Sequence, residues 1–238
     1  MNWKTLMVNL LIALPVVADD FKTANALYDA GRFAEAAALY EKITPSSAGV
    51  LFNLGNACFR QNKLGLAILH YERARRIAPR DPDILANLKF AQQRLGVDEV
   101  NQPSQPFRRF WTNVTASRTQ VEWSWMEITA WWIVWLAVAG GIWLPKWRTG
   151  FLLAAAMAAC VWAVATAALI SRITSPPEAI VLVSKAEARS APVPLATALF
   201  PLTEGTRVAI REDRGEWWFI ERADGKQGWM ARSSLERI

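Results

Sequence analysis

The sequence of 238 residues predicts a multi-domain α + β membrane protein, with paired α-α helices, two transmembrane helices and a small C-terminal β-barrel. Three observations predict this arrangement. A helical pattern repeats within residues 21–96, two long uncharged stretches follow between residues 128 and 170, and short alternating apolar runs begin after Pro177. A composition that is 53% hydrophobic and contains 13 Trp agrees with a membrane protein.

The net charge of +6 does not indicate a nucleic-acid partner, because of where the basic residues lie. Residues 19–99 and 177–238 are nearly balanced in charge, and the surplus falls in residues 100–176, beside the apolar stretches. Basic residues that flank membrane segments have this distribution. Cys58 and Cys160 fall in different predicted parts of the chain, so we expect no disulfide between them.

Residues 1–18 have the features of a signal peptide. Lys4 precedes an apolar run that is too short to span a bilayer, and the small residues Val16 and Ala18 stand before a predicted cleavage site. An uncleaved anchor is the alternative. In both cases we expect residue 20 to lie outside the cytoplasm.

Residues 19–97 contain two copies of one helical pair. Four positions recur 31 residues later, as Ala24/Gly55, Gly31/Asn62, Ala36/Ala67 and Tyr40/Tyr71. The small residues let the two helices of each copy approach closely, and the tyrosines fill the space beside them. These positions resemble those of the tetratricopeptide repeat (TPR), so we expect a TPR domain of about two repeats.

A further helix is expected to cap this short array. Asp81 provides an N-cap, Pro82 suits the first helical position and Gly96 ends the helix. Arrays of this kind usually need about three units to bury their apolar faces. The sequence leaves open whether a partner completes the core.

Residues 98–125 are expected to form a linker and juxtamembrane segment, and residues 126–171 a transmembrane hairpin. Stretches 128–144 and 150–170 carry no charge, and at about 1.5 Å per residue each is long enough to cross a hydrocarbon core of about 30 Å. A buried soluble hairpin is the alternative. Lys146 and Arg148 lie in the turn, which places the turn in the cytoplasm, and thus both flanking domains on the periplasmic or outer side of the inner membrane.

Residues 177–238 are expected to form the barrel. Strand-like runs at 180–183, 208–212, 217–222 and 228–231 are separated by glycine-containing turns. Residues 204–230 resemble bacterial SH3-like domains. Alternation along the strands places Trp218 and Ile220 on the core side with Val208 and Ile210, and leaves Trp217 on the groove side.

The sequence indicates neither an enzyme nor a cofactor. His70 is the only histidine, and the chain has no phosphate-binding glycine loop and no Cys/His spacing typical of a metal site. A structural role for His70 on its helix is the expected one. We therefore looked for binding residues instead of catalytic ones.

Two sets of side chains are candidate partner-binding residues. First helices line the concave face of TPR arrays, and there amides could bond a peptide backbone while aromatic rings hold its side chains. Alternatively, Asn53 and Asn87 stabilise local helix contacts. In the barrel, Trp217 and Trp229 are candidate groove residues, with a core role as the alternative for Trp229. The first set comprises Asn25, Tyr28, Phe52, Asn53, Asn56, Phe59 and Asn87.

The order of these parts resembles the BatE-like proteins of the Bacteroides aerotolerance (Bat) group. The best local match is the second repeat, which begins L-F-N-L-G-N-A-C-F-R at residue 51. The resemblance implies a non-catalytic membrane-anchored scaffold or adaptor in a bacterial envelope complex. It also implies partners such as von Willebrand factor A-type Bat proteins and a MoxR-type ATPase, beside membrane lipid. A peptidoglycan-binding protein that acts through the SH3-like domain is the alternative.

Overall fold

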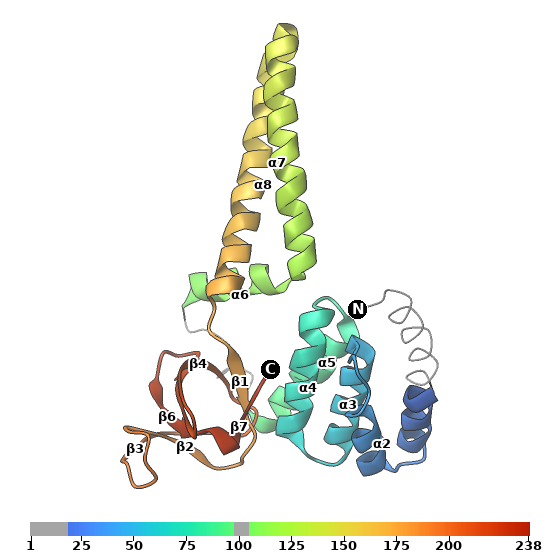
Figure 1. The fold of residues 1–238 in the computed structure, drawn as a ribbon, viewed down its shortest axis with the longest axis vertical. Coiled ribbons are helices and arrows are strands. Elements are labelled where there is room, and N and C mark those ends of the chain that lie inside the picture. Colours follow the sequence, from blue (N-terminus) through green and yellow to red (C-terminus); the bar gives the residue numbers. More distant parts are fainter. Residues whose placement is uncertain (1–18, 98–104) are drawn as a thin grey trace, which may run out of the picture. The chain divides into compact units, whose positions relative to one another are not determined.

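The computed structural model describes residues 19–97 and 105–238 (Figure 1). The predicted signal peptide and most of the predicted linker lie outside these residues. The chain divides into two compact units. One combines the residues before 104 with Pro176–Ile238, and the other is Gln105–Ser175.

The helical part of the first unit begins with a helix over residues 19–29 and continues with α2 (Phe33–Tyr40), α3 (Ala48–Arg60), α4 (Leu64–Ile77) and α5 (Pro82–Leu95). The Asp81 carboxylate accepts hydrogen bonds from the backbone N–H groups of Asp83 and Ile84 at the start of α5. Gly96 ends α5 in the left-handed conformation. These two caps are the ones that the sequence predicted.

The repeated positions form the core of the helical part. Ala24, Ala36 and Ala67 are fully buried, as are Tyr40 and Tyr71. A Cβ atom on Gly55 would lie only 2.6 Å from the Tyr71 ring, so α3 and α4 approach as closely as they do because position 55 lacks a side chain. This confirms the predicted roles of the small residues and tyrosines.

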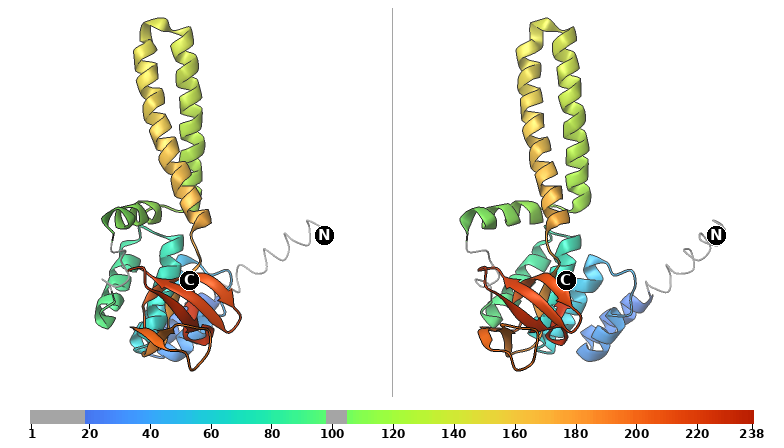
Figure 2. Two further views of the ribbon diagram at one scale, coloured as in Figure 1. Left: turned by 90° about the vertical axis from the view of Figure 1, so that its left-hand side faces the viewer. Right: turned by 60° about the vertical axis from the view of Figure 1, so that its left-hand side comes forward.

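The C-terminal part is one antiparallel sheet of seven strands in the order β3-β2-β6-β5-β4-β1-β7. The strands are β1 (Glu178–Val181), β2 (Ala186–Arg189), β3 (Ala198–Leu202), β4 (Arg207–Arg214), β5 (Trp217–Arg222), β6 (Gln227–Ala231) and β7 (Leu235–Arg237). The sheet is strongly curved (Figure 2).

The expected closed barrel is wrong. The end strands β3 and β7 do not pair with each other in the described part of the chain. Strand β7 has only three residues, and β3 contains Pro201, which has no backbone N–H to donate. The sheet therefore stays open at these edges.

Alternation within the sheet is as predicted. Val208, Ile210, Trp218 and Ile220 are buried in one hydrophobic cluster. Trp217, one position before Trp218, is only half-buried.

The sheet packs against α4 and completes the core of the helical part. Ile180 of β1 belongs to the same buried cluster as the repeat tyrosines, and Leu182 and Ile238 pack against that cluster. Gly205, with φ of +80°, brings its turn so close that a Cβ atom would lie 2.7 Å from Ile68 Cδ1. The chain itself thus covers this face of its repeat array.

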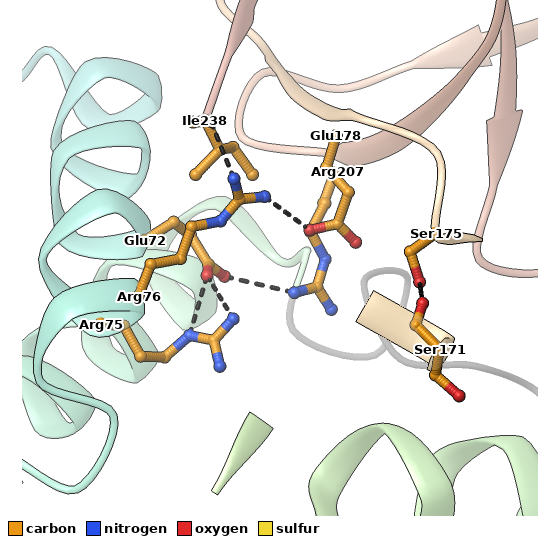
Figure 3. A network of polar contacts seen from close by, with 8 residues as sticks. All are labelled: Glu72, Arg75, Arg76, Ser171, Ser175, Glu178, Arg207 and Ile238. Atoms are coloured by element: carbon orange, nitrogen blue, oxygen red, sulfur yellow. Dashed lines mark hydrogen bonds and ion pairs between the residues drawn. The ribbon is translucent and has the colours of Figure 1, made fainter. Parts of the chain in front are cut away.

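A polar network joins the two parts (Figure 3). The Glu72 carboxylate is buried on α4, 2.7 Å from Arg75 Nη2 and 3.6 Å from Arg207 Nη1 of β4. Arg76 pairs with Glu178 at 3.0 Å. Burial alone would raise the pKa of Glu72, but the positive charges of Arg75 and Arg207 outweigh it and lower this pKa. The carboxylate is therefore ionised at neutral pH.

The second unit contains α6 (Pro106–Ala116), α7 (Gln120–Trp143), the short 3-10 helix η1 (Pro145–Trp147) and α8 (Arg148–Thr174). Helices α7 and α8 lie antiparallel and side by side (Figure 2). Both are long and apolar enough to cross a membrane, by length and composition. Helix α6 falls in the predicted linker and juxtamembrane segment, where the sequence analysis predicted no helix.

Candidate functional site

Asparagine and tyrosine side chains form the same hydrogen-bonded group in both repeats. Asn25 Oδ1 accepts hydrogen bonds from the Tyr40 hydroxyl at 2.5 Å and from Asn53 Nδ2 at 3.0 Å. Burial raises the pKa of Tyr40, so its hydroxyl stays protonated and donates. The second repeat has the corresponding group, with bonds of 2.7 and 2.9 Å among Asn56, Tyr71 and Asn87.

These bonds define what the four asparagines can still do. Asn53 and Asn87 each donate to the first helix of the preceding repeat, which is the local structural role that the sequence left as an alternative. The Nδ2 groups of Asn25 and Asn56 make no side-chain hydrogen bond within the described residues. All four side chains are only partly buried. Asn25 and Asn56 therefore keep amide donors that a ligand could use.

An aromatic row runs beside the asparagines at the same spacing of 31 residues, through Tyr28, Phe59 and Phe90. The Phe59 and Phe90 rings are in contact, with centroids 5.6 Å apart, and Phe90 is 57% exposed. The Arg94 guanidinium lies 5.4 Å from the centre of the Phe59 ring. The sequence analysis missed Phe90, although adding the repeat period to Phe59 would have found it.

Phe52 has a different position. Its ring lies 5.9 Å from that of Tyr71, and it packs against the core of the helical part. At the other end of the array, a hollow of about 320 Å³ is lined by Asn25, Tyr28, Asp29, Tyr40 and Asn53. We call the surface formed by the asparagines and the aromatic row the TPR groove.

The two candidate tryptophans of the sheet differ in accessibility. Trp217 contributes to the lining of two hollows, of about 660 and 920 Å³. Trp229 is buried, with its ring 5.1 Å from that of Phe219 and the Arg214 guanidinium 4.8 Å from its centre. Trp217 is thus the more accessible of the two.

His70 lies in the interior of the first unit. It is 5% exposed on α4, and burial lowers its pKa to about 4, so the imidazole is neutral at neutral pH. Its Nδ1 has no hydrogen-bond partner in the described part of the chain. Across the same residues, no group of three or more His, Cys, Asp or Glu side chains could hold a metal ion.

Comparison with known proteins gives one match. No curated protein is similar to the chain. Residues 21–82 match the tetratricopeptide repeat family, a class of protein-interaction module, and this match supports the prediction of TPR repeats in the helical part.

Proposed function

We propose that this chain is a non-catalytic, membrane-anchored adaptor that holds a partner protein in its TPR groove. The observation that carries the proposal is the repetition of Asn25/Asn56/Asn87 and Tyr28/Phe59/Phe90 along a region that matches the TPR family. Residues that build only a core need no accessible aromatic ring, whereas Phe90 is more than half exposed. Exposed aromatic rings beside amide donors are typical of a peptide-binding surface.

Within this groove we assign two roles. The amides of Asn25 and Asn56 donate to backbone carbonyl groups of the partner, and Asn53 and Asn87 hold those amides in place. Tyr28, Phe59 and Phe90 contact its side chains. Phe52 supports the groove through its contact with Tyr71.

Photo-crosslinking in native membranes tests this proposal. A photoreactive amino acid at position 59 or 90 should capture a discrete partner, and Phe90→Ala should reduce capture from position 59. Position 42 provides the control, because Lys42 is exposed outside the groove. Equal capture from positions 42, 59 and 90 would contradict a specific groove.

For the anchor, we propose that residues 126–171 cross the inner membrane twice, with domains 19–97 and 177–238 on the periplasmic side. Two observations support this. Helices α7 and α8 have suitable length and composition, and the residues before and after them share one compact unit, which requires an even number of crossings. A periplasm-active reporter should therefore be inactive when fused after residue 148 and active after residue 238. The reverse result would refute this topology.

We further propose a Bat-type envelope complex as the setting, with von Willebrand factor A-type proteins and a MoxR-type ATPase system as partners. The order of signal peptide, TPR domain, hairpin and SH3-like domain supports this assignment by resemblance. Catalysis would then belong to the ATPase. Identification of the captured protein by mass spectrometry tests the assignment, and capture of an unrelated soluble enzyme would refute it.

Accessible Trp217 favours a second candidate function, binding of peptidoglycan by the sheet. The full chain would then co-sediment with purified cell-wall sacculi, and Trp217→Ala would abolish co-sedimentation. Co-sedimentation that is equal with and without Trp217 would refute this role for the sheet.

A further inference from the structure

The sheet presents a second surface, lined by basic side chains on both sides of an apolar centre. Pro194, Trp217 and Ala231 line both hollows. Lys185 and Arg189 line the smaller hollow, and Arg73, Arg232 and Arg237 line the larger one. We call these two hollows together the Trp217 surface.

Most of these basic groups are already paired within the chain. The ion pairs are Arg73–Glu236 at 2.7 Å, Arg189–Glu187 at 3.6 Å and Arg237–Asp213 at 2.8 Å. In contrast, the exposed side chains of Lys185 and Arg232 make no ion pair or hydrogen bond within residues 19–97 and 105–238. Glu216 also lines the larger hollow, but its carboxylate is not paired with Arg232. Two cations thus remain available to an anionic ligand.

Arg232 lies beside a buried donor that has no acceptor. Its guanidinium is 5.4 Å from the centre of the Trp218 ring, and Trp218 lines the larger hollow. The Nε1–H group of Trp218 is buried and has no hydrogen-bond partner in the described structure. Buried donors normally have a partner. An oxygen anion that enters beside Arg232 would therefore have both an unpaired cation and an unsatisfied donor as neighbours.

The apolar centre and its rim are suited to a protein segment. Leu195, next to Pro194, is 98% exposed, which is uncommon for a large apolar side chain unless it contributes to a contact. In an extended segment, neighbouring side chains point in opposite directions, so one can contact Trp217 while an adjacent group reaches a cation.

We propose that the Trp217 surface binds an extended segment of a partner protein that carries a carboxylate next to a large apolar side chain. The carboxylate pairs with Arg232, and the apolar side chain packs on Trp217. This inference rests on the proposed adaptor function, since it assigns a protein partner, but it uses the sheet and not the TPR groove.

Selection of random heptapeptides displayed on phage tests the proposal. The detergent-solubilised full chain is the bait, and peptides that also bind Trp217→Ala are removed. The remaining peptides should carry Asp or Glu next to a large apolar residue. Replacing that acid by its amide, or making Arg232→Glu, should weaken binding about tenfold or more. Arg232 is exposed, so this variant does not disturb the core; Lys42→Glu is the matched charge reversal and should bind as the unaltered chain does.

Three results would overturn the proposal. They are the absence of any Trp217-dependent peptide, Trp217-dependent peptides without an acid, and binding that is unchanged in Arg232→Glu. Trp217-dependent binding of sacculi without any peptide enrichment would overturn it as well, since the ligand would then be the cell wall. Phe90→Ala should leave peptide binding intact, so failure of the TPR groove and failure of the Trp217 surface can be told apart.

Discussion

Replacing Glu72 with glutamine should lower the free energy of unfolding of the first unit by about 3 kcal/mol. The Glu72 side chain is 3% exposed and compensates the charges of Arg75 and Arg207, on α4 and β4. Removing one partner of a buried ion pair costs about 3–5 kcal/mol. The two arginines are 19% and 26% exposed, so water offsets part of this loss and the lower end of the range applies.

Urea unfolding of the full chain in detergent, followed by circular dichroism, measures this effect. Glu35→Gln is the control, because Glu35 pairs with Arg32 in solvent and its removal should leave the urea midpoint almost unchanged. The charges of the arginines lower the folded-state pKa of Glu72. The stabilisation is therefore present above about pH 4.5 and is lost as the pH falls through the folded-state value. Equal midpoints for Glu72→Gln and the unaltered chain would refute the reasoning.

Three further changes test other parts of the first unit. Because the pKa of His70 is about 4 in the folded chain, against 6.5 for an unperturbed histidine, the unfolded chain takes up the proton first. The free energy of unfolding should thus fall by up to about 3 kcal/mol between pH 6.5 and pH 4, and His70→Gln should flatten this slope in urea titrations; an identical slope would contradict the burial argument. Gly55→Ala places a Cβ atom 2.6 Å from the Tyr71 ring and should cost about 1–3 kcal/mol by thermal unfolding, whereas Gly49→Ala in the same helix meets nothing closer than 3.9 Å and should not destabilise. Tyr71→Phe removes a 2.7 Å hydrogen bond and should cost about 1 kcal/mol by urea unfolding, more than Tyr28→Phe, whose hydroxyl has no hydrogen bond in the described structure; equal losses would show that the bond contributes nothing.

The helical part was predictable because its determinants recur within the sequence. Ala24/Gly55 and Tyr40/Tyr71 report a close helix contact and the ring that fills it, and both can be recognised from spacing alone. The same spacing locates the asparagines of the TPR groove. It does not tell that Asn53 and Asn87 donate to neighbouring repeats, since this depends on the rotation of each helix.

The sheet was predictable only in part. The four strand-like runs correspond to β1, β4, β5 and β6, and they have clear alternation or strong turn residues. Strands β2, β3 and β7 were not located individually, because β2 and β7 are short and charged and β3 contains Pro201. Without the positions of the end strands, closure of a barrel could not be judged.

Packing of the sheet on α4 could not be predicted. It depends on pairs such as Glu72–Arg207 and Arg73–Glu236, whose members stand more than 130 positions apart in the sequence. Charged residues of this kind normally lie at the surface, and no local pattern distinguishes those that a distant segment will cover.

Ile180 has a consequence for the order in which the protein can fold during synthesis. The helical part leaves the ribosome first, but the cluster that contains Tyr40 and Tyr71 also requires Ile180, which follows the whole of α7 and α8. Until then, the apolar face of α4 has no covering strand, and the carboxylate of Glu72 lacks its partner from β4. The nascent repeats are therefore expected to be most open to proteases and chaperones while the apolar hairpin is being made.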